Sequence, residues 1–264
     1  MKRVLARIYV WVLLALLYAP LVFIAIFSFT ESRVLGNWTG FSTGLYVNLF
    51  TDSGNASLIS AIENSLLIAL IAALVSTLLG TVAAVGIFNL TGKKKYTMQL
   101  LNSIPMINPD IITGVSLFLL FVFLHISQGF VTVVLAHITF CTPYVVLSVM
   151  PRLTQMNPNT YEAALDLGAT PLVAMRKVLV PQLRPGMISG FILAFTMSLD
   201  DFAVTFFTRG TVGLDTLSTY IYTDARKGGL TPELRPLMTI IFLTLLMLLV
   251  VINLRQARLR KNNR

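Results

Sequence analysis

Three acidic residues lie inside apolar stretches of the sequence, where charge is rare. Asp110 follows an Asn-Pro pair, and Asp200 and Asp201 are adjacent. An ionised carboxylate at the centre of a bilayer costs roughly 2.5–3.5 kcal/mol, so such residues normally face a bundle interior or an aqueous cavity. Since no Lys or Arg lies within the same stretches, this negative charge favours the passage of a cation. Two alternatives stay open, in which the acids cap helix ends or pair with a neighbouring chain.

The remaining polar residues give little support to other chemistry. His125 and His137 lack the H-E-x-x-H spacing of a zinc protease, so we expect hydrogen-bonded or packed histidines and no metal site. The Gly-x-Gly-Asp pattern of intramembrane aspartyl proteases is absent, and so is the G-x-x-x-x-G-K-[ST] loop that cradles nucleotide phosphates. The sequence therefore predicts no catalytic residue and no cofactor in this chain. An intramembrane enzyme and a purely structural membrane scaffold remain the rivals from other functional classes.

The elements that carry these residues follow from hydrophobicity. Of 264 residues, 56% are hydrophobic and 12% are charged, against about 25% charged in soluble domains, so much of the surface faces lipid. The single cysteine, Cys141, lies in an apolar run and is expected in the core. A spanning helix needs about 20 apolar residues. Six stretches qualify, approximately residues 8–29, 64–90, 103–124, 129–150, 186–207 and 236–254.

The first stretch follows basic residues, but it is too long for the apolar core of a cleavable signal peptide. The predicted fold class is therefore an all-α integral membrane protein with six transmembrane helices in a single domain, residues 1–264. With the N-terminus in the cytoplasm, the inside segments hold all but five of the 20 Lys and Arg residues, which satisfies the positive-inside rule. We expect both termini in the cytoplasm, Asp200 and Asp201 in the outer part of the fifth span, and Asp110 near the cytoplasmic end of the third.

The segment 151–185 is too polar to span and carries its own helix signals. Asn157-Pro158 is typical of a helix start, with Asn at the N-cap and Pro at the first helical position. Glu162 then falls in the first turns, where the helix dipole favours an acid. Gly168 is expected to end this helix in the left-handed conformation. A second short helix, opened by a Thr-Pro pair, is expected to run to about Val180 and to end at the prolines that follow. A purely structural loop is the alternative.

The same loop resembles the EAA loop of the permeases of bacterial ABC importers. The family pattern is Glu-Ala-Ala, three residues, Gly, nine residues and Ile-x-Leu-Pro, and this chain keeps every spacing with Val in place of Ile and Leu. The matching residues are Glu162, Ala163, Ala164, Gly168, Ala169 and Val178-Leu179-Val180-Pro181. The resemblance implies the type I ABC importer permease fold. It also implies that the first five of these residues couple the chain to a separate ATPase subunit, which binds ATP and Mg.

Further segments resemble the spermidine/putrescine permeases, and their second permease subunit in particular. These segments are residues 36–46, 109–111, 136–141 and 198–202. The resemblance implies polyamine import, with Asp110, Asp200 and Asp201 along the substrate pathway. It implies a homologous second permease, an ATPase dimer and an extracytoplasmic binding protein as partners, in the inner membrane of a bacterium and without nucleic acid. A permease for ferric ion, thiamine or an amino acid is the alternative among transporters.

Overall fold

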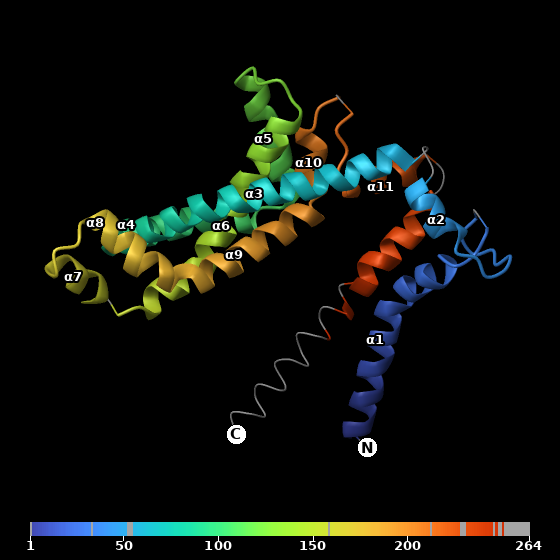
Figure 1. Cartoon of the computed structure of the whole chain (residues 1–264), viewed down its shortest axis with the longest axis horizontal. Coiled ribbons are helices and arrows are strands. Elements are labelled where there is room, and N and C mark those ends of the chain that lie inside the picture. Colours follow the sequence, from blue (N-terminus) through green and yellow to red (C-terminus); the bar gives the residue numbers. More distant parts are fainter. Residues whose placement is uncertain are drawn as a thin grey trace. The chain divides into compact units, whose positions relative to one another are not determined.

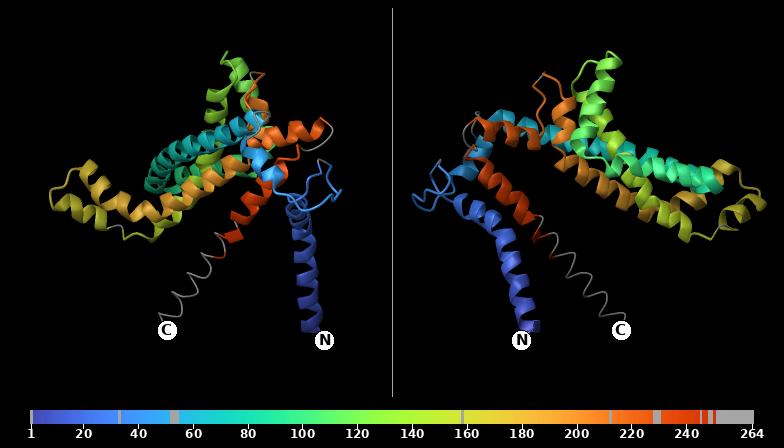
Figure 2. Two further views of the ribbon diagram at one scale, coloured as in Figure 1. Left: turned by 45° about the vertical axis from the view of Figure 1, so that its right-hand side comes forward. Right: turned by 180° about the vertical axis from the view of Figure 1, so that it is seen from behind.

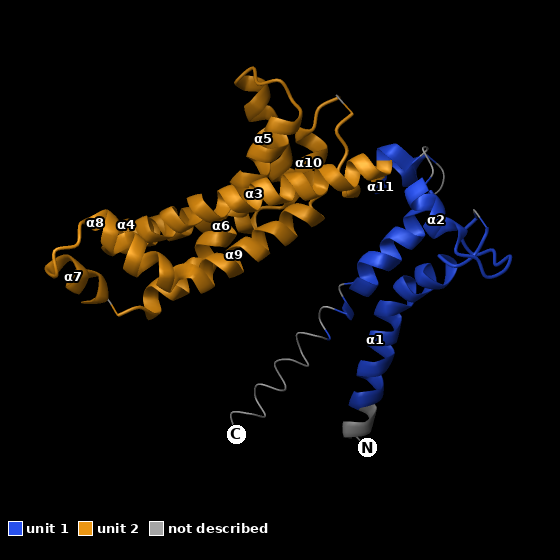
Figure 3. Cartoon of the chain, viewed as in Figure 1, with its two compact units in different colours: residues 1–57, 221–264 blue, residues 58–220 orange. Residues whose placement is uncertain are grey.

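The computed structural model describes residues 2–250, apart from 33, 52–54, 158, 212, 228–230, 245 and 248–249. Within this part of the chain the regular structure is helical (Figure 1), apart from an isolated antiparallel bridge between Thr30 and Phe41. Contacts divide the chain into two compact units, residues 1–57 with 221–264 and residues 58–220 (Figure 3). The single domain expected from the sequence stays a prediction.

Four helical stretches of the described chain are long and apolar enough to span a membrane. They are Ala6–Phe27 within α1 (Lys2–Phe27), α3 (Ala56–Asn89), α6 (Phe130–Gln155) and Pro171–Asp200. A bent pair of helices gives a fifth span if the two are counted together. The predicted sixth span, 236–254, is described as the helix Leu234–Thr244, and its remainder falls largely outside the described residues. The all-α membrane fold is thus as predicted, whereas the count of six stays a prediction.

The first unit contains α1, α2 (Gly44–Thr51) and the helix Leu234–Thr244. The rings of Tyr18 and Phe242, 6.4 Å apart, join α1 to the last of these helices. The buried guanidinium of Arg235 donates a hydrogen bond of 3.0 Å to the carbonyl of Ser32. The spanning stretch of α1 is otherwise not buried by the rest of the chain, as a lipid-facing helix requires.

The predicted third span, 103–124, is wrong as a single straight helix. The chain forms α4 (Gly92–Ile107) and α5 (Asp110–Phe123), and their axes differ by 104°. Pro109 causes the break, because a proline pushes the preceding residue out of the α conformation. Asn108 accordingly has φ −73° and ψ 133°, and the Pro109 carbonyl accepts the first hydrogen bonds of α5.

The second loop helix does not end near Val180, as the sequence predicts. Instead α8 (Pro171–Ala174), the π-helix η2 (Met175–Leu179) and α9 (Val180–Asp200) form one helical stretch. Proline cannot donate to the helix ladder. The wider π-turn, in which the Val180 N–H bonds to the Met175 carbonyl, absorbs that interruption without ending the helix.

The predicted fifth span, 186–207, ends early for a different reason. Helix α9 stops at Asp200, and a separate short helix, α10 (Ala203–Thr208), follows. Asp201 lies at the break in an extended conformation, with ψ 131°. Its side chain binds backbone N–H groups of α10, and such local bonds compete with continuation of a helix.

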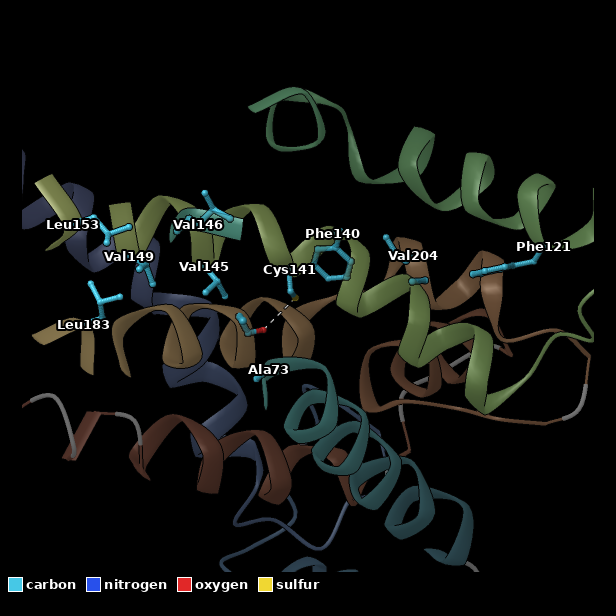
Figure 4. Packing of buried hydrophobic residues seen from close by; sticks show 13 residues of the cluster. Ala73, Phe121, Phe140, Cys141, Val145, Val146, Val149, Leu153, Leu183 and Val204 are labelled. Carbon is cyan, nitrogen blue, oxygen red and sulfur yellow. Dashed lines mark hydrogen bonds between the residues drawn. The ribbon is translucent and has the colours of Figure 1, made fainter. Parts of the chain in front are cut away.

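Helices α6 and α9 pack along two stripes of residues spaced four apart, which we call the α6–α9 seam. Figure 4 shows Cys141, Val145, Val149 and Leu153 of the α6 stripe. The stripe on α6 is His137, Cys141, Val145, Val149 and Leu153, and the stripe on α9 is Gly186, Gly190, Ala194 and Ser198. A Cβ added to Gly190 would lie 3.1 Å from Val145, and the buried thiol of Cys141 donates to the Ala194 carbonyl at 3.4 Å. Small residues permit such close approach between spanning helices, and the core position predicted for Cys141 is confirmed.

Two other helices approach the same assembly at glycines. A Cβ on Gly80 of α3 would lie 2.7 Å from Val145, and Ser76 donates to the Ile138 carbonyl of α6 at 3.2 Å. On the other side, a Cβ on Gly114 of α5 would lie 3.0 Å from the Ala203 carbonyl of α10. Both views of Figure 2 show α3, α6 and α9 running alongside one another in the second unit.

Candidate functional site

The three acids predicted from the sequence line one pocket in the second unit, so the expected separation of Asp110 from Asp200 and Asp201 along the spans is wrong. Asp110 comes from the start of α5, whereas Asp200 and Asp201 come from the end of α9. Phe140, Thr196 and Met197 complete the lining, and the pocket has a volume of about 180 Å³. We call it the acidic pocket. Asp110 directly follows the first helix break, and Asp201 lies at the second. None of the described lining residues of the pocket carries a positive charge.

The three carboxylates differ in their surroundings. Asp110 and Asp200 are exposed, and Asp110 lies in the first turn of α5. The side chain of Asp201 is only 6% exposed. Its Oδ1 accepts from the N–H of Val204 at 3.2 Å, and its Oδ2 accepts from the N–H and the hydroxyl of Thr205, each at 2.8 Å. Asp201 therefore caps α10, the alternative that the sequence left open for these acids, while Asp200 faces the pocket.

His137 joins the acidic pocket to the α6–α9 seam. Its fully buried ring lies 2.6 Å from the hydroxyl of Ser198 through Nδ1, and 2.9 Å from the hydroxyl of Thr205 through Nε2. The same Nε2 is 3.4 Å from Asp201. The sequence predicts a packed or hydrogen-bonded histidine, which is confirmed. Its link to the acids had no local signal, because the partners lie more than 60 residues away along the chain.

The loop between α6 and α9 forms a second candidate site. Helix α7 is described as Asn159–Asp166, and Pro158, the predicted first helical residue, lies outside the described residues. The predicted cap at Asn157 is present, since its side chain accepts from the N–H of Asn159 at 3.1 Å. The helix ends at Gly168, whose φ is +83°, as predicted. The N–H groups of Gly168 and Ala169 bond back to the carbonyls of Leu165 and Ala164, which is the Schellman arrangement.

An apolar surface is exposed on this loop. Leu167, at the end of α7, is 89% exposed, and Leu172, in α8, is 70% exposed. Glu162, Ala163 and Gly168 are exposed as well, whereas Ala164 and Ala169 are partly buried. We give the name docking face to these five exposed residues, which are Glu162, Ala163, Leu167, Gly168 and Leu172. The sequence alone does not place the two leucines in this surface, because only the structure shows that they are exposed.

A second pocket of about 300 Å³ lies beside the docking face. It is lined by Glu162 and Tyr161 from α7, by Met175 and Leu179 from η2, and by the ends of α3 and α6. The docking face and the acidic pocket lie at opposite ends of the helical stretch Pro171–Asp200. Because an α-helix rises 1.5 Å per residue, this stretch of 30 residues is about 45 Å long.

Chains with this fold occur in solved structures of ABC transporters. The chain superposes on a chain of a bacterial ABC transporter that imports the acidic polysaccharide alginate, with a TM-score of 0.72, 12% identity, and coverage of 97% of this chain and 95% of the other. A chain of the MetNI methionine ABC transporter in an inward-facing conformation gives 0.60 at 20% identity, covering 80% and 97%. The ABC importer permease fold predicted from the sequence is confirmed.

Relatives found by sequence share a higher identity with this chain than these solved structures do. The chain is 38% identical over 255 residues to the spermidine/putrescine transport system permease protein PotC of Haemophilus influenzae, covering 97% of this chain and 96% of the relative. It is 38% identical over 234 residues to the putrescine transport system permease protein PotI of Escherichia coli K12, covering 85% and 81%. Residues 76–264 match the family described as binding-protein-dependent transport system inner membrane component. The chain is a multi-pass membrane protein that belongs to this family of transport permeases.

Proposed function

We propose that this chain is a permease subunit of an ATP-driven importer of polyamines. The acidic pocket supports the substrate class, because it exposes carboxylates and its described lining residues include no cation to neutralise them. A protonated amine could pair with Asp110 and Asp200 while its charge lies against the ring of Phe140, an arrangement that favours cations. The names of the relatives point to the same substrate class.

The proposed partners are a homologous second permease, an ATPase dimer and an extracytoplasmic binding protein, in the inner membrane of a bacterium. The docking face is the surface offered to the ATPase, which holds the ATP and Mg that this chain has no motif to bind. The proposed orientation has both termini in the cytoplasm, which the distribution of the basic residues supports. The chain itself then has no catalytic role.

The long helical stretch supports a mechanism of alternating access. Closure of the ATPase dimer displaces the docking face, and Pro171–Asp200 carries that displacement to the acidic pocket. Motion of this kind passes through rigid elements and is taken up at a few hinge positions. The breaks at Asn108–Pro109 and at Asp201 supply such positions next to the acids.

Reconstitution tests the proposal. The complete complex, placed in vesicles with the binding protein, is expected to import labelled spermidine or putrescine when ATP is supplied on the ATPase side. Vesicles without ATP, or with an ATPase variant that cannot hydrolyse it, are the controls. Uptake of ferric ion, thiamine or an amino acid, with no uptake of either polyamine, would refute the polyamine assignment and leave the importer intact.

A further inference from the structure

Asp200 lies between two anchored residues. Ser198, two positions before it, and Asp201, directly after it, are both held by groups outside α9. Helix α9 ends at Asp200 itself, so the last turn could fray without such anchors. The exposed carboxylate therefore depends for its direction on how firmly its two neighbours are fixed.

His137 is the residue common to both anchors. The carboxylate of Asp201 only accepts hydrogen bonds, so the Thr205 hydroxyl must donate its proton to Asp201. The Thr205 oxygen then accepts from Nε2–H of His137, and in the neutral ring the unprotonated Nδ1 accepts from the hydroxyl of Ser198. A neutral ring with its proton on Nε2 satisfies every partner. The donors all point one way, from Ser198 to Asp201, and bonds in such chains strengthen one another.

The ring of His137 lies between three helices of the second unit. The ring is fully buried and packs edge-on against Phe140, which lines the acidic pocket. Ser198 belongs to α9, Thr205 to α10 and His137 to α6. Helix α10 is only six residues long, so bonds to its neighbours help to hold it in place, and the Thr132 hydroxyl of α6 adds another at the Thr208 carbonyl.

We propose that His137 is a positioning residue that fixes the α9–α10 break and thereby keeps the Asp200 carboxylate in the acidic pocket. It acts through Ser198, Thr205 and Asp201 and does not touch the substrate. Its use in polyamine transport rests on the function proposed above, but the position of residue 200 can be measured without any substrate.

The experiment places a thiol at position 200. In an otherwise cysteine-free Cys141→Ala chain, Asp200→Cys is treated with a small cationic thiol reagent and with a neutral reagent of the same size. The assembled complex is used throughout. With His137 present, the cationic reagent is expected to react faster than the neutral one, because Asp110 and Asp201 line the same pocket.

Two neutral substitutions then separate the two ring nitrogens. The measured quantity is the rate with the cationic reagent divided by the rate with the neutral reagent. The side-chain amide of His137→Gln can occupy the position of Nε2, so this variant is expected to keep the ratio. The shorter amide of His137→Asn can occupy only the position of Nδ1. The Asn variant is expected to lower this ratio towards one, because without the bond from the Nε2 position residue 200 is no longer held beside Asp110 and Asp201. Equal ratios in the Gln and Asn variants and in the parent would overturn the proposal.

A second pair guards against failed assembly of the Asn variant. Thr205→Val removes the hydroxyl between His137 and Asp201 at nearly constant volume, whereas Thr205→Ser keeps it. The ratio of the cationic to the neutral rate should therefore fall in the Val variant and stay unchanged in the Ser variant. Thr142→Val is the control, because that hydroxyl bonds only within α6, to the Ile138 carbonyl at 2.6 Å. If the parent complex imports no polyamine, the proposed function is refuted, but the thiol rates still test the role of His137. Failure of the proposed function and failure of the positioning role are therefore distinguishable.

Discussion

At the scale of single residues, two adjacent carboxylates have different tasks. Asp201 is almost fully buried and makes three hydrogen bonds to α10, whereas Asp200 is exposed to the acidic pocket. Adjacent acids look interchangeable in the sequence. What separates them is the end of α9, after which the two side chains enter different surroundings.

Isosteric substitutions should separate these tasks. Asp200→Asn removes the charge of the pocket acid and is expected to lower polyamine uptake strongly while leaving the midpoint of thermal unfolding unchanged. Asp201→Asn cannot accept at both oxygens, so one N–H of α10 loses its partner, and the free energy of unfolding should fall by about 1–2 kcal/mol. Uptake and thermal unfolding of the purified complexes check both. Normal uptake by Asp200→Asn would remove Asp200 from the pathway.

At the scale of elements, glycines set how closely the helices approach. Val145 of α6 lies between Gly80 of α3 and Gly190 of α9, so it cannot move away from either. A methyl group added at one of these glycines must therefore displace a helix backbone. Gly86, also in α3, has nothing within 4 Å of its Cβ position and offers a matched comparison.

Substitution by alanine should have opposite effects at the two α3 glycines. Gly80→Ala places a Cβ 2.7 Å from Val145 and is expected to destabilise the fold by about 1–3 kcal/mol through overpacking. Gly86→Ala meets no neighbour and should stabilise it by about 0.5–1 kcal/mol, because alanine is the better helix former. Thermal unfolding in detergent measures both. Similar midpoints for the two variants would contradict the close approach of α3 to α6.

Local signals predicted these elements only in part. Asn157 and Gly168 mark the ends of α7 correctly, because capping depends on neighbouring residues alone. Pro109 carried a signal for the break between α4 and α5, but the apolar run around it favoured a single span. The continuation of α9 through its prolines, and the meeting of Asp110 with Asp200, depend on packing between distant segments. Composition and spacing do not encode such contacts.

At the scale of the whole molecule, the docking face is an apolar surface that the second unit does not cover. Leu167 and Leu172, both largely exposed, lie on this loop together with the exposed Ala163 and Gly168. The helical stretch that starts at Pro171 connects this surface to the acidic pocket. A partner bound at one end can therefore act on the other through a single element.

Polar substitution of the docking face should release the ATPase. The double variant Leu167→Ser with Leu172→Ser is expected to lose co-purification of the ATPase subunits, because both side chains lie on the surface proposed to dock. Its midpoint of thermal unfolding should stay unchanged, since neither side chain packs in the core. Leu167→Met with Leu172→Met keeps the apolar surface and should retain the ATPase. Retention by the serine variant would place the docking surface elsewhere.

The α6–α9 seam also limits which substitutions its positions can accept during evolution. Val145 faces Gly190, and Cys141 faces Ala194, so enlargement at position 190 or 194 is tolerated only when the opposite residue, at 145 or 141, becomes smaller. Residues in contact tend to vary together among relatives. Across the family, positions 145 and 190, and positions 141 and 194, should therefore change as pairs or remain small, whereas lipid-facing positions on the same helices should vary independently.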